Sequence, residues 1–153
     1  MVIRRLGSGD AEILRILAVE NARFDEPGQG GALQPLSTDT ARRLLESEQT
    51  YVLVAFLGDE PVGFLFAFEL LRRAADVGPN ELYVDEVGVR DDHRREGIGR
   101  ALLDALSQLA RGRGITNGFV FTNASNAPAL ALYESFGGVR PNPDDVMFDF
   151  RLG

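Results

Sequence analysis

The feature that most constrains the fold of this chain is a change of hydrophobic period around one short turn. Residues 81–89 carry apolar and β-branched side chains in a pattern typical of a strand. After the turn, apolar residues recur at the spacing of one helix face: Ile98, Leu102, Leu106 and Leu109. A short apolar run at residues 119–121, expected to be a buried strand, completes a strand–helix–strand unit. The two strands of such a unit pair in parallel through a right-handed crossover.

The segments before this unit predict antiparallel strands, so the sheet is expected to be mixed. Residues 51–57 and 62–70 are β-branched and aromatic runs, and Gly58 with Asp59 marks the tight turn of a hairpin between them. The other expected elements are a strand at residues 2–6, a helix that starts at 8–10 and runs to 24, a helix capped by Thr38 or Asp39 that runs to Leu45, a helix at 127–136 and a closing strand at 146–152, with loops at 25–37 and 72–80.

Length and composition fit one compact domain over residues 1–153. The chain has no cysteine and one histidine, which argues against a disulfide framework, a thiol nucleophile and the usual zinc ligand sets. The most apolar stretch, residues 62–71, is interrupted by Gly63 and Glu69 and is too short to span a membrane. The N-terminal residues lack an apolar signal-peptide core, so we expect a cytoplasmic protein with no membrane partner.

The net charge of the chain is −7, with a pI of about 4.7. This charge argues against a nucleic-acid partner, which would require a basic face. It is compatible with a cationic substrate, because an acidic cleft attracts amines. Many proteins are acidic for solubility alone, so the charge does not decide between these explanations.

The turn at residues 94–100 reads Arg-Arg-Glu-Gly-Ile-Gly-Arg and opens the long helix. Unpaired N–H groups and the positive end of the helix dipole favour an anion there, and glycine lets phosphate oxygens approach the backbone. The spacing is neither the dinucleotide fingerprint nor a P-loop, which counts against a nucleotide-binding module. The expected pyrophosphate contacts are Arg94, Arg95, Gly97, Ile98, Gly99 and Arg100.

Two segments together carry a family resemblance. Arg94, Gly97 and Gly99 match Arg/Gln-x-x-Gly-x-Gly/Ala, and residues 126–137 match Asn-x-x-Ala-x-x-x-Tyr-x-x-x-Gly. Both resemble the signature of the GNAT acetyltransferases, and the resemblance covers roughly residues 81–138. It implies the GNAT α/β (α+β) fold: a mixed central sheet of about six to seven strands flanked by about four helices. It also implies acetyl-CoA as the acyl donor. Gly138 departs from the family, which often has Phe at this position.

The resemblance also assigns roles along residues 81–89. In the family this strand splays from its neighbour, and a bulge exposes N–H groups to the pantetheine arm and the thioester carbonyl. Val87, Gly88 and Val89 occupy the matching positions, and a glycine within a strand fits a bulge or a close ligand approach. An N–H near the thioester oxygen would stabilise the oxyanion formed on attack.

Amide formation needs a base for the protonated amine and a proton donor for the departing thiolate. We predict Glu86 as the base. Asp85 is the alternative, because neighbouring strand residues face opposite ways, although a bulge changes that phase. By resemblance Tyr133 is the acid, and Asn126 either contacts the cofactor or caps a helix. His93 lies in a charged turn and is not expected to be catalytic.

Residues 81–89 and 144–150 resemble the corresponding segments of the class I aminoglycoside 3-N-acetyltransferases. This implies a cationic small-molecule amine as acceptor, with Asp85, Glu86 and Asp149 as substrate-binding carboxylates. Asp25, Glu26, Glu69, Asp144 and Asp145 are further candidate carboxylates, although many of these charges serve solubility.

Three alternatives stay open: another small amine, a peptide or protein amine, and a non-catalytic acetyl-CoA sensor. Fold alone does not choose among them. The resemblance also leaves a homodimer open, with residues 148–152 as the candidate pairing edge.

Overall fold

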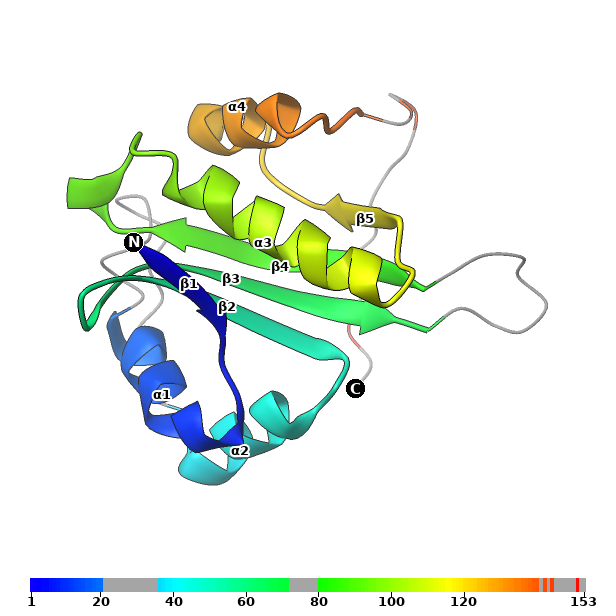
Figure 1. Ribbon diagram of the computed structural model, residues 1–153. Coiled ribbons are helices and arrows are strands. Elements are labelled where there is room, and N and C mark those ends of the chain that lie inside the picture. Colours follow the sequence, from blue (N-terminus) through cyan, green and yellow to red (C-terminus); the bar gives the residue numbers. More distant parts are fainter. Residues whose placement is uncertain (21–35, 72–79, 141, 143, 145–150, 152–153) are drawn as a thin grey trace. The chain divides into compact units, whose positions relative to one another are not determined.

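The computed structural model describes residues 1–20, 36–71, 80–140, 142, 144 and 151 (Figure 1). These residues fall into two compact units, Met1–Phe121 and Thr122–Gly153, and each unit is described by itself. The single domain over residues 1–153 therefore stays a prediction.

The first unit contains one five-stranded sheet in the order β1-β2-β3-β4-β5. Its strands are β1 (Val2–Arg5), β2 (Thr50–Leu57), β3 (Glu60–Leu70), β4 (Glu81–Val89) and β5 (Asn117–Val120). The first four pair antiparallel and β5 pairs parallel to β4, which confirms the mixed sheet. The described residues hold five strands rather than six to seven. The closing strand expected at 146–152 lies almost entirely outside them, as do most of the loops expected at 25–37 and 72–80.

Four α-helices lie in the described part of the chain, as expected: α1 (Ala11–Glu20), α2 (Thr38–Glu46), α3 (Ile98–Gly112) and, in the second unit, α4 (Ala127–Ser135). A short 3₁₀ turn, Ser8–Asp10, precedes α1. The prediction that Thr38 or Asp39 caps α2 was wrong. The N-cap is Ser37, whose hydroxyl accepts the Thr40 N–H at 3.1 Å.

Helices cover both faces of the sheet in the first unit (Figure 1). On one face, α1 and α2 bury a core together with Val52, Val54 and Phe64. On the other face α3 lies against β3, where a side chain on Gly63 would meet the Ile98 methyl group at 2.7 Å. Gly63 and Phe64 are neighbours in β3, so their opposite faces follow from the alternation of a strand.

Two burial predictions were wrong. Leu109 is exposed, because α3 turns Ala110 instead toward the sheet in its last turn. The strand at residues 117–120 is not buried: Phe119 is 39% exposed, and Phe121 just after it is 60% exposed.

Candidate active site

An irregularity in β4 decides where its acidic side chains lie. The pairing of β3 with β4 runs from Phe66↔Glu86 directly to Ala67↔Val84, so Asp85 is an extra residue without a partner. Such a bulge bends the strand and shifts the alternation of the residues beyond it. The bulge that we predicted is therefore present in β4, but at Asp85 and not at Gly88.

The bulge brings Asp85 and Glu86 to one face of the sheet. Glu86 pairs with Phe66 and Tyr83 pairs with Phe68, and the rings of Phe66 and Phe68 lie side by side with centroids 5.1 Å apart. Asp85 reaches the same face, because its side chain hydrogen-bonds with the Tyr83 hydroxyl and thereby raises the pKa of Tyr83. The expectation that only one of the two acids faces this side is thus corrected.

The open edge of β4 begins at the same place. The parallel pairing with β5 ends at Val84↔Val120, so residues 85–89 lie beyond it. On the other side of β4, the Arg90 N–H donates to the Val62 carbonyl at 3.0 Å. Because N–H groups alternate along a strand, those of Val87 and Val89 point away from β3, toward this open edge.

Gly88 has a packing role that the sequence did not reveal. It pairs with Phe64, and a Cβ at Gly88 would overlap the Phe64 ring. Phe64 belongs to the core beneath α1 and α2. The glycine is therefore required by the core on that face, independently of any ligand at the edge of β4.

The turn after β4 has the geometry of an anion-binding helix start. Arg95 has a φ of 66° and Gly97 a φ of 82°, so two of three consecutive residues adopt the left-handed conformation. For arginine this conformation is uncommon and strained, and such strain clusters at functional sites. Gly97 provides no side-chain cap for α3, and a Cβ placed on it would meet nothing within 4 Å. The turn is therefore open toward the first N–H groups of α3, those of Ile98, Gly99 and Arg100.

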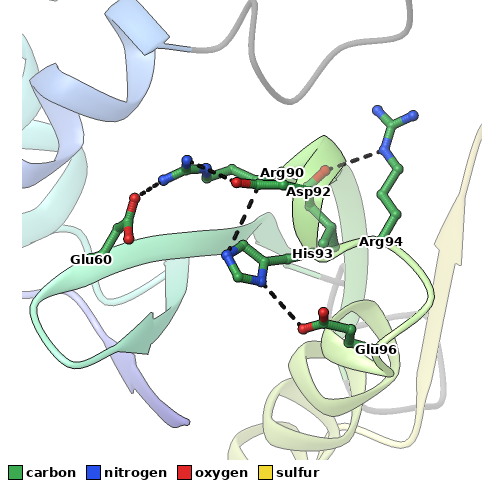
Figure 2. Close-up of polar contacts among 7 residues, drawn as sticks. Glu60, Arg90, Asp92, His93, Arg94 and Glu96 are labelled. Atoms are coloured by element: carbon green, nitrogen blue, oxygen red, sulfur yellow. Dashed lines mark hydrogen bonds and ion pairs between the residues drawn. The ribbon is translucent and has the colours of Figure 1, made fainter.

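Arg94 connects this turn to the open edge of β4. Its Nε donates to the Val89 carbonyl at 3.4 Å, on the edge that points away from β3. Its guanidinium also pairs with Asp91 at 2.7 Å. The Arg94 side chain is nevertheless partly exposed. Figure 2 shows Arg94 beside Arg90, Asp92 and His93 at the start of this turn. Arg100 pairs with Asp104 at 3.3 Å along the surface of α3.

His93 belongs to a chain of polar contacts that supports the turn (Figure 2). Arg90 pairs with Glu60 on β3, and with Asp92 at 3.2 Å. The His93 Nδ1 lies 3.3 Å from Glu96, and its Nε2 lies 4.0 Å from Asp92. The hydrogen bond from Arg90 to Glu60 raises the pKa of Arg90 and connects the end of β4 to the start of β3. These contacts favour a structural role for His93.

The second unit carries Asn126 and Tyr133 on α4. The Asn126 side chain accepts the Ala129 N–H at 3.1 Å, so of the two roles expected for Asn126 the helix cap is observed. Gly137 has a φ of 96°, and the Gly138 N–H donates to the Tyr133 carbonyl at 2.9 Å, which closes the C-terminus of the helix. Gly138 lies so close to that carbonyl that a larger residue would require the backbone to shift. Tyr133 is half-buried, and its role as acid stays a prediction.

Glu69 was a candidate substrate carboxylate, but its side chain is buried and fully engaged. It accepts hydrogen bonds from Asn80 at 2.5 Å, from Tyr51 at 3.0 Å and from Arg113 at 2.9 Å. Burial alone would raise the pKa of Glu69, but these hydrogen bonds outweigh it and lower the pKa. Burial of the Tyr51 hydroxyl and its hydrogen bond to Glu69 both raise the pKa of Tyr51. Glu69 therefore stabilises the sheet rather than binding an amine.

Asp25, Glu26, Asp145 and Asp149 lie outside the described residues, and so do most of residues 148–152. Asp144 is described, and its N–H donates to the Asn142 side chain at 3.0 Å. None of these carboxylates is tested as a substrate ligand.

Sequence reasoning missed the aromatic side chains that share a face with the two acids. Tyr83 on β4 stacks on Phe119 of β5, with ring centroids 5.4 Å apart. Phe119 and Phe121 are two residues apart, which in a strand places both on one face. That alternation was readable from the sequence, but the parallel register Tyr83↔Phe119 was not.

No helix among the described residues is long and apolar enough to cross a membrane.

Comparison with known proteins agrees with this geometry. A thialysine N-epsilon-acetyltransferase of Caenorhabditis elegans is 29% identical over 119 residues, which are 76% of this chain and 71% of that protein. The ribosomal protein bS18-alanine N-acetyltransferase of Escherichia coli (strain K12) is 37% identical over 75 residues, 49% of this chain and 48% of that protein. The crystal structure of an aminoglycoside acetyltransferase from an uncultured soil metagenomic sample has a TM-score of 0.87 and 28% identity, and covers 99% of this chain and 98% of its own.

A match to a protein family decides to which family the chain belongs. Residues 16–138 match the acetyltransferase (GNAT) family, a stretch that contains β4, the arginine–glycine turn and α4. The chain is an N-acetyltransferase and belongs to the GNAT family.

Proposed function

We propose that this enzyme transfers the acetyl group of acetyl-CoA to a primary amine of a cationic small molecule, and that this molecule is an aminoglycoside acetylated at its 3-amino group. The observation that carries the proposal is the bulge at Asp85. It places two adjacent carboxylates on one face of β4, at the point where the open edge of the strand begins and a few residues before the turn at residues 94–100.

The residues present fit coenzyme A as the donor. The uncapped start of α3 and the left-handed turn before it supply N–H groups for a pyrophosphate, and Arg94 and Arg95 supply positive charge. Arg94 also contacts the Val89 carbonyl at the open edge of β4, so its charge lies beside the strand that is proposed to hold the rest of the donor. When bound, acetyl-CoA supplies an activated acetyl thioester.

The chemistry expected of the chain follows from its donors and acceptors. Glu86 takes the proton of the ammonium group, so that the free amine nitrogen can bond to the acetyl carbon. The N–H groups of Val87 and Val89 donate to the carbonyl oxygen while it carries negative charge. The bond between carbon and sulfur then breaks, and Tyr133 gives the departing sulfur its proton. The nitrogen, now bonded to the acetyl carbon, loses its second proton through solvent to the Tyr133 oxygen, which leaves a neutral amide and restores the tyrosine. Glu86 returns to the carboxylate when it loses its proton to solvent.

Two arguments support an aminoglycoside as acceptor. The two adjacent acids suit a molecule with several ammonium groups, because each carboxylate can hold one. The aminoglycoside acetyltransferase from soil is also similar to nearly the whole length of this chain. Asp149 is proposed as a further substrate ligand, and residues 148–152 as a pairing edge in a homodimer, both from family resemblance alone.

A second acceptor class has its own support. The two curated relatives compared above are named for other acceptors, the ε-nitrogen of thialysine and an alanine of ribosomal protein bS18. The alternative is therefore another small amine or a peptide amine on the same site. A chain that binds acetyl-CoA only as a sensor would need neither the acid pair nor a proton donor.

The experiment is an assay of free-thiol release from acetyl-CoA with gentamicin, kanamycin, spermidine and a lysine peptide, each tested separately. Release with gentamicin and a product acetylated at the 3-amine support the aminoglycoside. Release only with spermidine or the peptide keeps the acetyltransferase and replaces the acceptor. Tight acetyl-CoA binding without release from any amine supports the sensor.

A further inference from the structure

Three aromatic rings, one from β4, one from β5 and one from the residue directly after β5, form a cluster on the face of the sheet that carries Asp85. Tyr83 and Phe119 stack at an interplanar angle of 27°. The Phe121 ring lies 5.8 Å from that of Phe119 and 6.2 Å from that of Tyr83. We refer to Tyr83, Phe119 and Phe121 as the aromatic cluster.

Two rings of the cluster are exposed and the third is half-buried. Phe121 is 60% exposed and Phe119 39%, whereas Tyr83 is half-buried, like Phe66 and Phe68 on the same face of β3. Two exposed phenyl rings beside each other are a surface that an apolar or a cationic ligand can cover.

The surroundings of the cluster decide between these two kinds of ligand. The Tyr83 hydroxyl hydrogen-bonds with Asp85, so a carboxylate lies at the edge of the cluster. Glu86 follows on the same face because of the bulge. An ammonium group over a ring face is attracted by the ring, and a neighbouring carboxylate adds charge attraction. The negative side chains at this border therefore favour a positively charged ligand.

We propose that the aromatic cluster and Asp85 form a subsite for a second ammonium group of the acceptor, separate from the amine that Glu86 deprotonates. This inference rests on the proposed function and deepens it: the enzyme selects acceptors with at least two ammonium groups. Tyr83 has two parts in the subsite, since its ring stacks on Phe119 and its hydroxyl orients Asp85.

The test measures binding of gentamicin and of spermidine by calorimetry, with coenzyme A present in place of acetyl-CoA so that no turnover occurs. Phe121→Ala and Phe119→Leu are each expected to weaken binding by about 3- to 30-fold, the range for the loss of a cation–π contact. Tyr83→Phe keeps the ring and removes the hydrogen bond to Asp85, so a smaller loss is expected.

A matched control removes an apolar side chain of similar exposure elsewhere. Leu109 on the outer side of α3 is 38% exposed, and Leu109→Ala is expected to bind gentamicin and spermidine as the wild type does. Circular dichroism and the affinity for coenzyme A confirm that each variant is folded. Folded Phe121→Ala and Phe119→Leu proteins that bind both amines with wild-type affinity overturn the subsite, and so does a wild type that binds neither.

The subsite and the proposed function fail in different ways. If the wild type acetylates gentamicin and the two phenylalanine variants bind it unchanged, the subsite is wrong and the function stands. If the wild type acetylates no amine but binds gentamicin in a way that depends on Phe121, the function is wrong and the subsite stands.

Discussion

Asp85 and Glu86 show how one extra residue in a strand sets the chemistry of neighbouring side chains. In a regular strand they would face opposite sides, and one of them would lie among the apolar residues under α3. The register of β3 with β4 places both on the other face, where Tyr83 holds Asp85 by a hydrogen bond. The roles proposed above divide between two acids on one face: Glu86 accepts a proton, and Asp85 binds a positive charge of the acceptor.

This division predicts different kinetics for two conservative changes at adjacent residues. Asp85→Asn is expected to raise KM for a multi-amine acceptor about fivefold, because one exposed charge contact contributes about 1 kcal/mol, with kcat little changed. Initial rates over a range of acceptor concentrations measure both parameters, and a monoamine acceptor is the control. A fall in kcat with KM unchanged would assign the base role to Asp85 instead of Glu86.

Glu69 is the buried acid whose ionisation stabilises the fold. Its pKa in the folded chain is below the ordinary value of 4.5, because its hydrogen-bond donors outweigh burial. A lowered pKa means that the contribution to stability is complete above the unfolded-state pKa. It is then lost as the pH falls through the folded-state pKa.

Glu69→Gln is therefore expected to lower the free energy of unfolding at pH 7 by about 2–3 kcal/mol, since it removes a buried, charge-assisted hydrogen-bond network. Urea unfolding over a pH series checks this, and the difference from wild type should shrink as the pH falls below about 4.5. Glu60→Gln is the control, because Glu60 is exposed and its loss should cost about 1 kcal/mol or less. A deficit in Glu69→Gln that is independent of pH would contradict this account of Glu69.

At the scale of elements, the local sequence pattern predicted a helix or strand correctly where the segment had one strong hydrophobic period. The bounds of β4 and the start of α3 agree with the prediction, because an alternating run and a helical run meet at a glycine turn. The bulge at Asp85 could not be placed, because it arises from pairing with β3, far along the chain. Leu109 was misassigned for a similar reason: the sheet contacts of α3 decide that Ala110 closes the buried face. Beyond these elements, the role of Tyr133 rests on the family signature alone.

The turn before α3 predicts opposite effects for two glycine-to-alanine changes at the ends of that helix. Gly97→Ala forces an L side chain into a φ of 82° and is expected to destabilise the protein by about 1–2 kcal/mol and to weaken acetyl-CoA binding. Gly112→Ala has open space and no positive φ, so it should stabilise the protein by up to about 1 kcal/mol without changing binding. Thermal unfolding and calorimetry measure both. Equal acetyl-CoA affinity in the two variants would argue against the turn as the pyrophosphate site.

At the scale of the whole molecule, positive and negative side chains lie at different places along the candidate site. The chain carries a net charge of −7; Arg94, Arg95 and Arg100 lie in the turn after β4 together with Glu96, whereas Asp85 and Glu86 lie on the strand itself. A polyanionic donor and a polycationic acceptor can therefore both be attracted, each to its own part of the surface.

This arrangement predicts a salt dependence that follows the charge of the acceptor. Raising the NaCl concentration from about 0.05 M to about 0.5 M should raise KM for a multi-amine acceptor several-fold, because exposed charges are screened within a shorter distance. KM for a monoamine should change less. Initial rates at both salt concentrations test this, and equal changes for the two acceptors would remove long-range attraction from the explanation.

The most direct test of the central claim, acetyl transfer to an amine with Glu86 as base, compares wild type and Glu86→Gln in one experiment. Thiol release from acetyl-CoA is followed with gentamicin, the product is identified by mass spectrometry, and acetyl-CoA affinity is measured on both proteins. We expect an acetylated product from the wild type, and a rate lower by about 100-fold or more in Glu86→Gln at unchanged acetyl-CoA affinity. A wild-type rate in Glu86→Gln, or no acetylated amine from either protein, would contradict it.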